Sequence, residues 1–372
     1  MQTLHVELNE RSYPILIAPS LLDQLAALIE QYRLGVRFVL ITDPIVDRIY
    51  AARVLAQLQR AGLHAAKIVV PQGERSKSLA RYNRIVAEML RLKYGRDTTV
   101  LALGGGVIGD LAGFVAATYM RGVDFIQIPT TLLAQVDASI GGKTAVNHRF
   151  GKNMIGAFHQ PRLVLIDTAT LNTLPQREIL CGLAEMIKHA LICDLAYFQM
   201  LERELAELLN LHPEKMSAAI AKSCAIKAEI VSRDEKESGQ RAWLNFGHTI
   251  GHALEAACGF EALRHGEAVV LGMLAETYLS KMTQRLSASD FERITNFLRT
   301  LPLTLRLDGI CIDEIEDFVA RDKKAQAGAV RMVLLRAIGE AEVTPDWPRL
   351  AGLREAVEFA LAVFSVPAAP AQ

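Results

Sequence analysis

Residues 98–110, TTVLALGGGVIGD, decide the fold of the first half of the chain. Residues 98–103 are apolar and β-branched and predict a buried strand, and residues 111–118 predict a helix just after the glycines. In a glycine-rich turn between strand and helix, backbone amides and the helix N-terminus can bind a pyrophosphate. Strands ending near residues 42 and 70 precede this turn, so it is not the first βα turn. Two interpretations of this turn stay open, a cofactor-binding loop and a plain tight turn.

The alternation of short apolar runs and amphipathic stretches extends outward from this turn to about residue 174. It predicts βαβ units on a parallel sheet, preceded by an edge hairpin formed by residues 3–8 and 13–17. The expected internal strands are residues 36–41, 66–70, 98–103, 124–128 and 163–166.

Beyond Pro175 the apolar spacing becomes helical, apart from an expected hairpin at residues 331–343. The expected fold is a Rossmann-like α/β domain over residues 1–175 and a mainly α-helical domain over residues 176–372, with a ligand cleft between them. The predicted helices are residues 176–192, 195–211, 213–232, 242–257, 266–281 and 288–299.

Composition excludes several classes of protein. The 372 residues carry 41 Lys+Arg and 41 Asp+Glu, and this zero net charge argues against a nucleic-acid or membrane-surface binder. The five cysteines are odd in number and form no C-x-x-C pair, so neither a disulfide framework nor a thiolate zinc site is indicated. No signal-like start or long apolar stretch appears, so a soluble cytoplasmic protein is expected.

Two acidic residues near the expected turns have competing interpretations. Asp43, at a strand end, suits a ribose hydroxyl pair, yet it suits equally well the N-cap of a helix that begins at Pro44. Residues 137–144, DASIGGKT, nearly match a phosphate-binding P-loop, but Asp137 replaces the first glycine. A carboxylate there would repel a triphosphate, which argues against a nucleoside triphosphatase.

The helical half contains candidate metal ligands. His248 and His252 are four residues apart and share one helical face, and His265 follows nearby. Two imidazoles with a third ligand are a known zinc arrangement, although a polar helix face with an incidental His265 fits too. A carboxylate partner is available in Glu185, which shares a helix face with Lys188 and His189; the ordinary interpretation of that face is a solvated one.

Taken together and in order, the motifs resemble those of the 3-dehydroquinate synthase family, the NAD- and metal-dependent cyclases of the shikimate pathway. The similarity extends from about residue 73 to residue 339. The segments that carry it are GGGVIGD at 104–110, QIPTTLLAQVDASIGGK at 127–143, GKNMIGAF at 151–158, GLAEMIK at 182–188, LNFGHTIGH at 244–252, HGE at 265–267 and RDKK at 321–324.

The resemblance implies a divalent metal, zinc or cobalt, held by Glu185, His248 and His265, which leaves His252 on the substrate side. It also implies NAD as cofactor and a homodimer. The implied NAD contacts are Asp43, Gly73, Glu74, Lys77, Gly105, Gly106, Gly109, Asp110, Thr130, Thr131, Lys143, Lys152, Thr170 and Thr173.

The resemblance further implies a substrate, 3-deoxy-D-arabino-heptulosonate 7-phosphate, that is oxidised transiently by NAD, loses phosphate, is re-reduced and closes by an internal aldol step. Its two anionic groups require local basic residues despite the zero net charge. The implied catalytic residues are Asp137, Lys143, Asn153, Lys188 and His252, and the implied substrate contacts are Arg121, Lys227, Arg241, Asn245, Lys323 and Lys324.

Specific roles follow as hypotheses from the resemblance. Lys143, Asn153 and Lys324 are expected to hold the phosphate. Lys188, Lys227 and Arg241 are expected to hold the carboxylate and hydroxyls. His252 is expected to relay protons, while Asp137 orients water near the metal.

The sequence departs from the family pattern at Gln72, Cys181 and His189-Ala190, which bears on the surroundings of the cofactor and metal. Three alternatives stay open: another sugar-phosphate cyclase, a metal-dependent polyol dehydrogenase of the same fold, and a catalytically inactive NAD-sensing module.

Overall fold

The structure is a computed structural model that describes residues 1–259, 262–305, 307, 310–325, 331–344 and 352–364. The chain packs as two compact units. The first contains Met1–Ile179 and Asn210–Lys236, and the second contains Leu180–Leu209 and Glu237–Gln372.

The first unit is built on a seven-stranded sheet with the strand order β1-β2-β9-β6-β5-β3-β4. β1 runs antiparallel to β2, and the other neighbouring pairs are parallel. The predicted parallel α/β architecture and its edge hairpin are thus confirmed. The strands of this sheet are β1 Gln2–Val6, β2 Tyr13–Ala18, β3 Arg37–Thr42, β4 His64–Val69, β5 Thr98–Gly104, β6 Asp124–Pro129 and β9 Leu163–Asp167.

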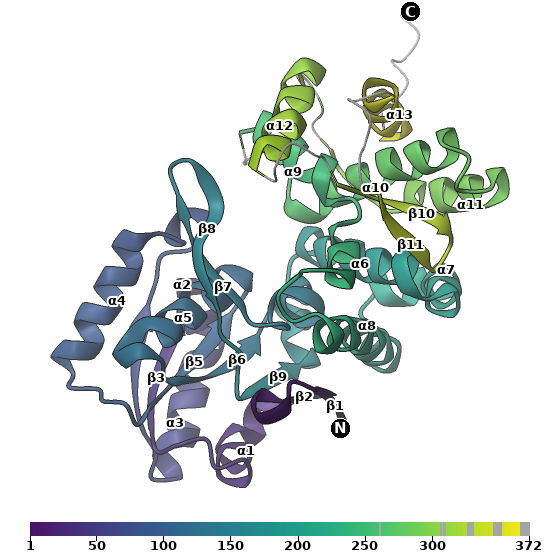
Figure 1. Cartoon of the computed structure of the whole chain (residues 1–372). Helices are drawn as coiled ribbons and strands as arrows, with labels where there is room; N and C mark the ends of the chain where they lie inside the picture. The colour runs from purple at the N-terminus through teal and green to yellow at the C-terminus, as the bar shows by residue number, and fades with distance from the viewer. Residues whose placement is uncertain (260–261, 306, 308–309, 326–330, 345–351, 365–372) are drawn as a thin grey trace, which may run out of the picture. The chain divides into compact units, whose positions relative to one another are not determined.

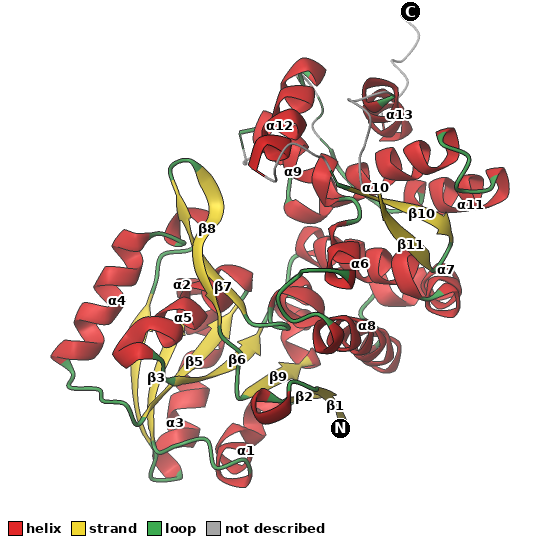
Figure 2. Ribbon diagram, viewed as in Figure 1, coloured by secondary structure: helices red, strands yellow, loops and turns green. Residues whose placement is uncertain are grey.

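Helices cover both faces of this sheet (Figure 2). Phe38 and Leu40 of β3 pack in an apolar cluster with α1 and α3, whereas Val39 and Ile41 pack in a second cluster with α4 and α5. Successive side chains of a strand point to opposite faces, so a strand buried on both sides is apolar throughout. This explains the uninterrupted apolar runs. The helices of this unit are α1 Leu25–Gln31, α2 Pro44–Val46, α3 Ala52–Arg60, α4 Leu79–Arg91, α5 Gly106–Thr118 and α8 Pro213–Arg233.

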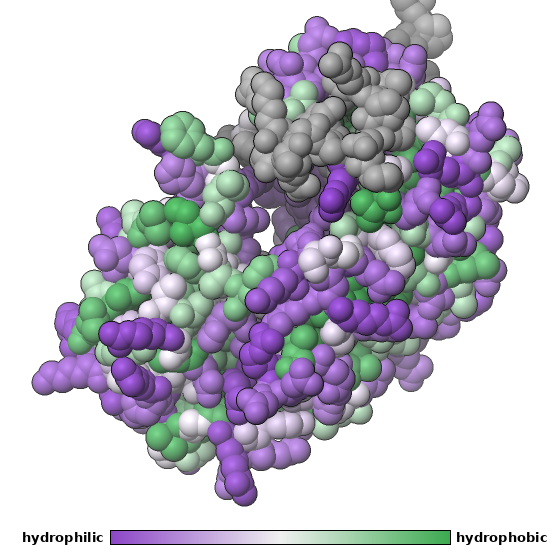
Figure 3. Space-filling view, in the orientation of Figure 1, coloured by the Kyte–Doolittle hydropathy of each residue, from purple (hydrophilic) through white to green (hydrophobic). Residues whose placement is uncertain are grey.

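An antiparallel hairpin, β7 (Lys143–His148) with β8 (Gly151–Phe158), follows the glycine-rich segment and was not predicted from the sequence. Its end projects beyond the helices of the first unit (Figure 1). Two apolar side chains near that end are largely in solvent, Phe150 at 80% and Met154 at 70% exposure. Elsewhere on the visible face of this unit, hydrophobic patches are small and separated by hydrophilic residues (Figure 3).

Helix α8 packs with the first unit although it lies among the helical segments of the sequence. The amide of Glu7 donates to Ser232 Oγ at 2.9 Å, and Cys224 Sγ lies 3.4 Å from the carbonyl oxygen of Gln135. The boundary expected at residue 175 follows the change of periodicity, whereas packing adds α8 to the sheet-containing unit.

In its described residues the second unit is mainly helical, and it contains the antiparallel hairpin β10–β11, which confirms the prediction for residues 331–343. α10 is its central helix, because it is buried along most of its length and packs against α9, α11, α13 and β10. Within the described residues, no helix combines the length and apolar character needed to cross a membrane. The elements are α6 Gln176–Cys193, α7 Leu195–Leu209, α9 His248–Ala257, α10 His265–Met282, α11 Ala288–Arg299, α12 Ile312–Ala325, α13 Leu353–Phe364, β10 Met332–Ala337 and β11 Glu340–Thr344.

The prediction of a single helix over residues 242–257 is wrong. Gln240–Asn245 form a 3₁₀ turn, and Gly247 adopts a left-handed conformation with φ of 77° before α9 begins at His248. A side chain at Gly247 would be strained by this φ and would also meet Met273 of α10. Glycine therefore permits both the break and the close packing of α9 on α10.

Candidate active site

The glycine turn joins β5 to α5, as expected for the strand–turn–helix context. Gly105 is the N-cap of α5, and a Cβ there would lie 3.0 Å from the Thr131 side chain. A Cβ on Gly109 would meet Gln127 of β6 at 2.9 Å, so this glycine lets α5 lie close to the sheet. α5 begins at Gly106, five residues earlier than predicted. The first amides of an α-helix have no acceptor within the helix, so the start of α5 at the end of the turn is an arrangement suited to a pyrophosphate.

A polar network beside this turn joins several predicted cofactor residues. Lys77 is 5% exposed, and its Nζ donates to Asp110 Oδ2 at 2.6 Å and to Asn153 Oδ1. Burial lowers the pKa of Lys77, but the carboxylates of Asp110 and Glu74 outweigh this effect and raise the pKa overall. Glu74 in turn accepts a hydrogen bond from Asn147 at 2.8 Å. The ammonium group therefore stays charged beside the glycine turn.

Other predicted cofactor residues have structural partners. Asp43 Oδ1 accepts from the amides of Ile45 and Val46 at 2.9 and 3.2 Å, which is the N-cap arrangement weighed in the sequence. Among the threonines predicted to contact the cofactor, Thr170 has a buried hydroxyl oxygen that accepts a hydrogen bond from Gln135 Nε2 at 3.0 Å. Further contacts are Thr130 N to Gly104 O at 3.0 Å, Thr131 Oγ1 to Ala134 N at 3.2 Å and Thr173 Oγ1 to Tyr50 at 2.7 Å. Gly73, with φ of 98°, precedes the turn that carries Glu74.

Basic residues predicted to contact substrate also lie in the first unit. Lys227 of α8 donates to the backbone oxygen and to Oδ1 of Asp137, both at 2.6 Å. Lys143 begins β7, and Lys152 and Asn153 lie in β8, so the unpredicted hairpin carries three of the predicted residues. Arg121 is exposed and has a positive φ of 70°.

The predicted metal ligands converge in the second unit. Glu185 of α6 is completely buried, and its Oε1 lies 3.4 Å from His248 Nε2 and 3.5 Å from His265 Nε2. One ligand atom from each of the three residues can be chosen so that all lie within 4.8 Å of one another. One carboxylate and two imidazoles are a donor set that suits zinc or cobalt and leaves a coordination position open. The residues present therefore fit the implied metal.

The charge states of the two histidines differ. Burial is the main reason that the pKa of His248 falls well below its ordinary value, and nearby Lys188 lowers it further. Burial also lowers the pKa of His265, but hydrogen bonds to Glu185 and Glu255 outweigh it and raise the pKa to about 9. The lowered pKa of His248 favours the neutral imidazole, the form that binds a metal.

Other residues that were predicted to belong to the site lie in the same unit. Lys188 forms an ion pair with Glu185, and both are buried together with His189, so the solvated helix face considered for α6 is wrong. His252 is exposed on α9, with its ring centroid 5.3 Å from that of His248. Arg241 is 1% exposed, and Asn245 Nδ2 donates to Glu237 at 3.0 Å. Lys323 and Lys324 lie in the last turn of α12, and their side chains fall outside the described part of the structure.

Two acidic residues at the site were missed by the sequence interpretation. Glu255 is buried, and its Oε2 lies 3.5 Å from His265 Nδ1. Its spacing of seven residues from His248 places it on the same face of α9, which is a signal that the sequence contains. Glu237 was missed as the partner of Asn245 because no periodic pattern includes it.

The chain combines a sheet domain with a glycine-rich βα turn and a helical unit with a Glu-His-His cluster, an architecture that it shares with solved sugar phosphate cyclases. A solved 2-epi-5-epi-valiolone synthase from Streptomyces hygroscopicus subsp. jinggangensis 5008, with NAD⁺ and Zn²⁺ bound, is 31% identical and superposes with a TM-score of 0.85 over 96% of this chain and 97% of that one. A 2-deoxy-scyllo-inosose synthase complexed with carbaglucose-6-phosphate, NAD⁺ and Co²⁺ has the same fold, at 24% identity and a TM-score of 0.86 over 96% and 99%.

Within this class the chain belongs to the 3-dehydroquinate synthase family. Residues 67–181 match the model of the family's N-terminal domain, and residues 182–325 match that of its C-terminal domain. A 3-dehydroquinate synthase from Hydrogenovibrio crunogenus is 48% identical over 360 residues, which cover 96% of this chain and 100% of that protein.

Proposed function

We propose that the chain is a carbon–oxygen lyase that converts 3-deoxy-D-arabino-heptulosonate 7-phosphate to 3-dehydroquinate and phosphate, with NAD and a divalent zinc or cobalt ion as cofactors. The observation that carries this proposal is the cluster of buried Glu185 with half-buried His248 and His265, with its ligand atoms within 4.8 Å, in a chain of this family. A homodimer and a cytoplasmic location stay predictions.

The residues of the second unit are proposed to bind the metal and the reacting part of the substrate. When bound, NAD takes up and returns a hydride, and the metal acts as a Lewis acid. The buried guanidinium of Arg241 suits a bidentate contact with the substrate carboxylate. Lys188 balances the charge of Glu185 and can donate to a substrate hydroxyl. His252, exposed next to His248, is proposed to relay a proton.

The residues of the first unit are proposed to bind NAD and the phosphate. The amides at the start of α5 would bind the pyrophosphate, and the charged Lys77 pairs with Asp110 of the same helix. Lys143 and Asn153, on the two strands of one hairpin, are assigned to the substrate phosphate together with Lys324. Lys227, whose ammonium group pairs with Asp137, is proposed to contact the substrate carboxylate or hydroxyls.

The test is to incubate the chain with the heptulosonate phosphate and NAD, with and without a chelator, and to follow phosphate, product and NADH. We expect phosphate and 3-dehydroquinate in equal amounts without accumulation of NADH. Activity should disappear with the chelator and in His265→Ala. The matched control is His212→Ala, which removes an exposed histidine at the start of α8.

Other results would contradict the proposal in distinguishable ways. Accumulating NADH without release of phosphate would favour a polyol dehydrogenase of this fold. Phosphate release with a different cyclic product would favour another sugar-phosphate cyclase. A wild-type chain that binds NAD and forms neither product would be a non-catalytic module.

A further inference from the structure

Glu276 is a completely buried carboxyl group near the middle of α10, a helix that is otherwise mostly apolar on its buried faces. Its Oε2 accepts a hydrogen bond from the amide of Gly247 at 2.6 Å. Gly247 is the N-cap of α9 and, as a glycine, has no side chain that could accept from the first amides of that helix. Glu276 also accepts from the amides of Thr249 and Ile250 in the first turn of α9. It therefore supplies the missing acceptor from a different helix.

The hydrogen bond reaches the proposed metal ligand through a single peptide group. The N–H of Gly247 and the C=O of Phe246 belong to the same planar unit and point in opposite directions. On the far side of this peptide, the Phe246 oxygen lies 3.1 Å from His248 Nδ1, which must donate because a carbonyl oxygen only accepts. The other ring nitrogen, Nε2, faces Glu185 at 3.4 Å.

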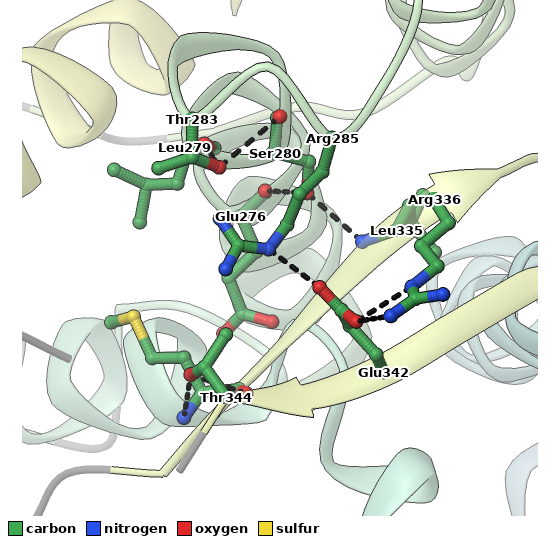
Figure 4. Close-up of polar contacts among 10 residues, drawn as sticks. Glu276, Leu279, Ser280, Thr283, Arg285, Leu335, Arg336, Glu342 and Thr344 are labelled. Atoms are coloured by element: carbon green, nitrogen blue, oxygen red, sulfur yellow. Dashed lines mark hydrogen bonds and ion pairs between the residues drawn. The ribbon is translucent and has the colours of Figure 1, made fainter. Parts of the chain in front are cut away.

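The surroundings of this peptide limit other ways of fixing it. Phe246 is fully buried, and a Cβ on Gly272 of α10 would lie only 1.9 Å from the Gly247 oxygen. The backbone of the turn thus packs directly on α10 at the level of Glu276. Ser280, one turn further along, donates to the backbone carbonyl oxygen of Glu276 at 2.7 Å and accepts from the amide of Leu335 at 3.0 Å (Figure 4). Its hydroxyl group thus links α10 to β10 and makes no bond to the Glu276 carboxyl group.

We propose that Glu276 is a positioning residue for the metal ligand His248: it holds the Phe246–Gly247 peptide, whose oxygen fixes the Nδ1–H tautomer and directs Nε2 to the metal. Partners of this kind, one step removed from the metal, orient histidine ligands, and their loss commonly weakens metal binding by about 10- to 100-fold. The inference rests on the proposed metal site at Glu185, His248 and His265.

The hydrogen bond from the Gly247 amide does not require the Glu276 carboxyl group to be ionised. Burial raises the pKa of Glu276 to about 8, although the amides of Gly247, Ile250 and Thr249 lower it. A neutral carboxyl oxygen still accepts from an amide, and so does the oxygen of a glutamine side chain. Glu276→Gln should therefore keep the function that Glu276→Leu removes.

The experiment measures the dissociation constant of Co²⁺ for the metal-free full chain by competition with a chelator, together with the visible spectrum of bound Co²⁺ and the folded fraction. We expect Glu276→Leu to bind Co²⁺ about 10- to 100-fold more weakly with an altered spectrum, and Glu276→Gln to bind like wild type. Ser280→Ala is the matched control: it removes buried hydrogen bonds one turn away and should lower Tm without changing Co²⁺ affinity.

Wild-type affinity in Glu276→Leu would overturn the inference, as would an equal loss of affinity in Ser280→Ala. If Glu276→Leu does not fold, Glu276→Asp decides, because the shorter side chain withdraws its oxygens from the Gly247 amide: equal affinities of the Asp and Gln variants would refute the role. If His265→Ala binds Co²⁺ as tightly as the wild type does, the proposed metal site itself is refuted, and the inference with it.

Discussion

The packing of α9 on α10 depends on Gly272, and replacing this glycine tests whether the backbone contact sets the geometry of the metal cluster. A Cβ at position 272 would lie 1.9 Å from the oxygen of Gly247 and 2.9 Å from the amide nitrogen of Gly251, whereas ordinary contact begins at 3.4 Å. The obstacle is backbone on a packed helix and cannot rotate away. Gly272→Ala must therefore move α9 away from α10.

The magnitude follows from two opposing effects. Alanine is favoured over glycine inside a helix by about 1 kcal/mol. Overpacking a filled interior costs about 1–3 kcal/mol, and more where backbone must shift. The net loss should be about 2 kcal/mol, or roughly 4–8 °C in Tm for a unit of this size. Since His248 and His265 lie on the two helices, Co²⁺ should also bind at least about 10-fold more weakly.

The assay combines thermal unfolding of the metal-free chain with Co²⁺ titration. Gly95→Ala is the matched control, because its Cβ would meet only the end of the flexible Asp97 side chain. That variant should unfold at or slightly above the wild-type temperature. A Gly272→Ala chain with wild-type Tm and wild-type Co²⁺ affinity would refute the argument that this backbone contact sets the ligand geometry.

Three further predictions concern stability, thiol reactivity and metal removal. Asp167 is 3% exposed and accepts hydrogen bonds from the amides of Ser20 and Leu22 at 2.8 and 3.0 Å. Asp167→Ala should therefore lower the free energy of unfolding, measured by urea titration, by about 2–4 kcal/mol. A loss below about 0.5 kcal/mol would contradict this prediction. Burial raises the pKa of the Cys224 thiol, so a thiol reagent at mildly alkaline pH should modify the exposed Cys311 much sooner, as peptide mass spectrometry of the native protein would show. Removing the metal should lower Tm, and adding back Zn²⁺ should restore it in wild type but not in His265→Ala.

The sheet of the first unit was largely predictable because its central strands are buried on both faces. β3 and β5 are buried along most of their length, and their apolar runs, residues 38–41 and 100–103, are visible in the sequence. The hairpin β7–β8 was not predictable in this way. Its glycines mask the strand pattern, and its burial alternates between half-buried and exposed along β8. The break before α9 was missed because Gly247 interrupts a pattern whose periodicity continues on both sides.

The metal cluster illustrates a different limit. Periodicity identified the polar face of α6 but could not separate a solvated face from one covered by α9 and α10. Glu185 and His189 are both completely buried, and only the family motifs indicated which residue would be a ligand. Glu276 gave no signal in sequence, because the amide that it accepts from lies 29 residues earlier and belongs to another helix.

The placement of α8 has a consequence for how the chain can be divided. The polypeptide leaves the sheet-containing unit after Ile179, returns for residues 210–236 and then leaves again. A gene split between residues 181 and 182, where the two family domains meet, would give an N-terminal fragment that lacks α8. Its edge strand β1 would lose the helix that packs against it. Neither half would be an autonomous folding module, so recombination that exchanges halves at this junction should succeed only by fragment complementation.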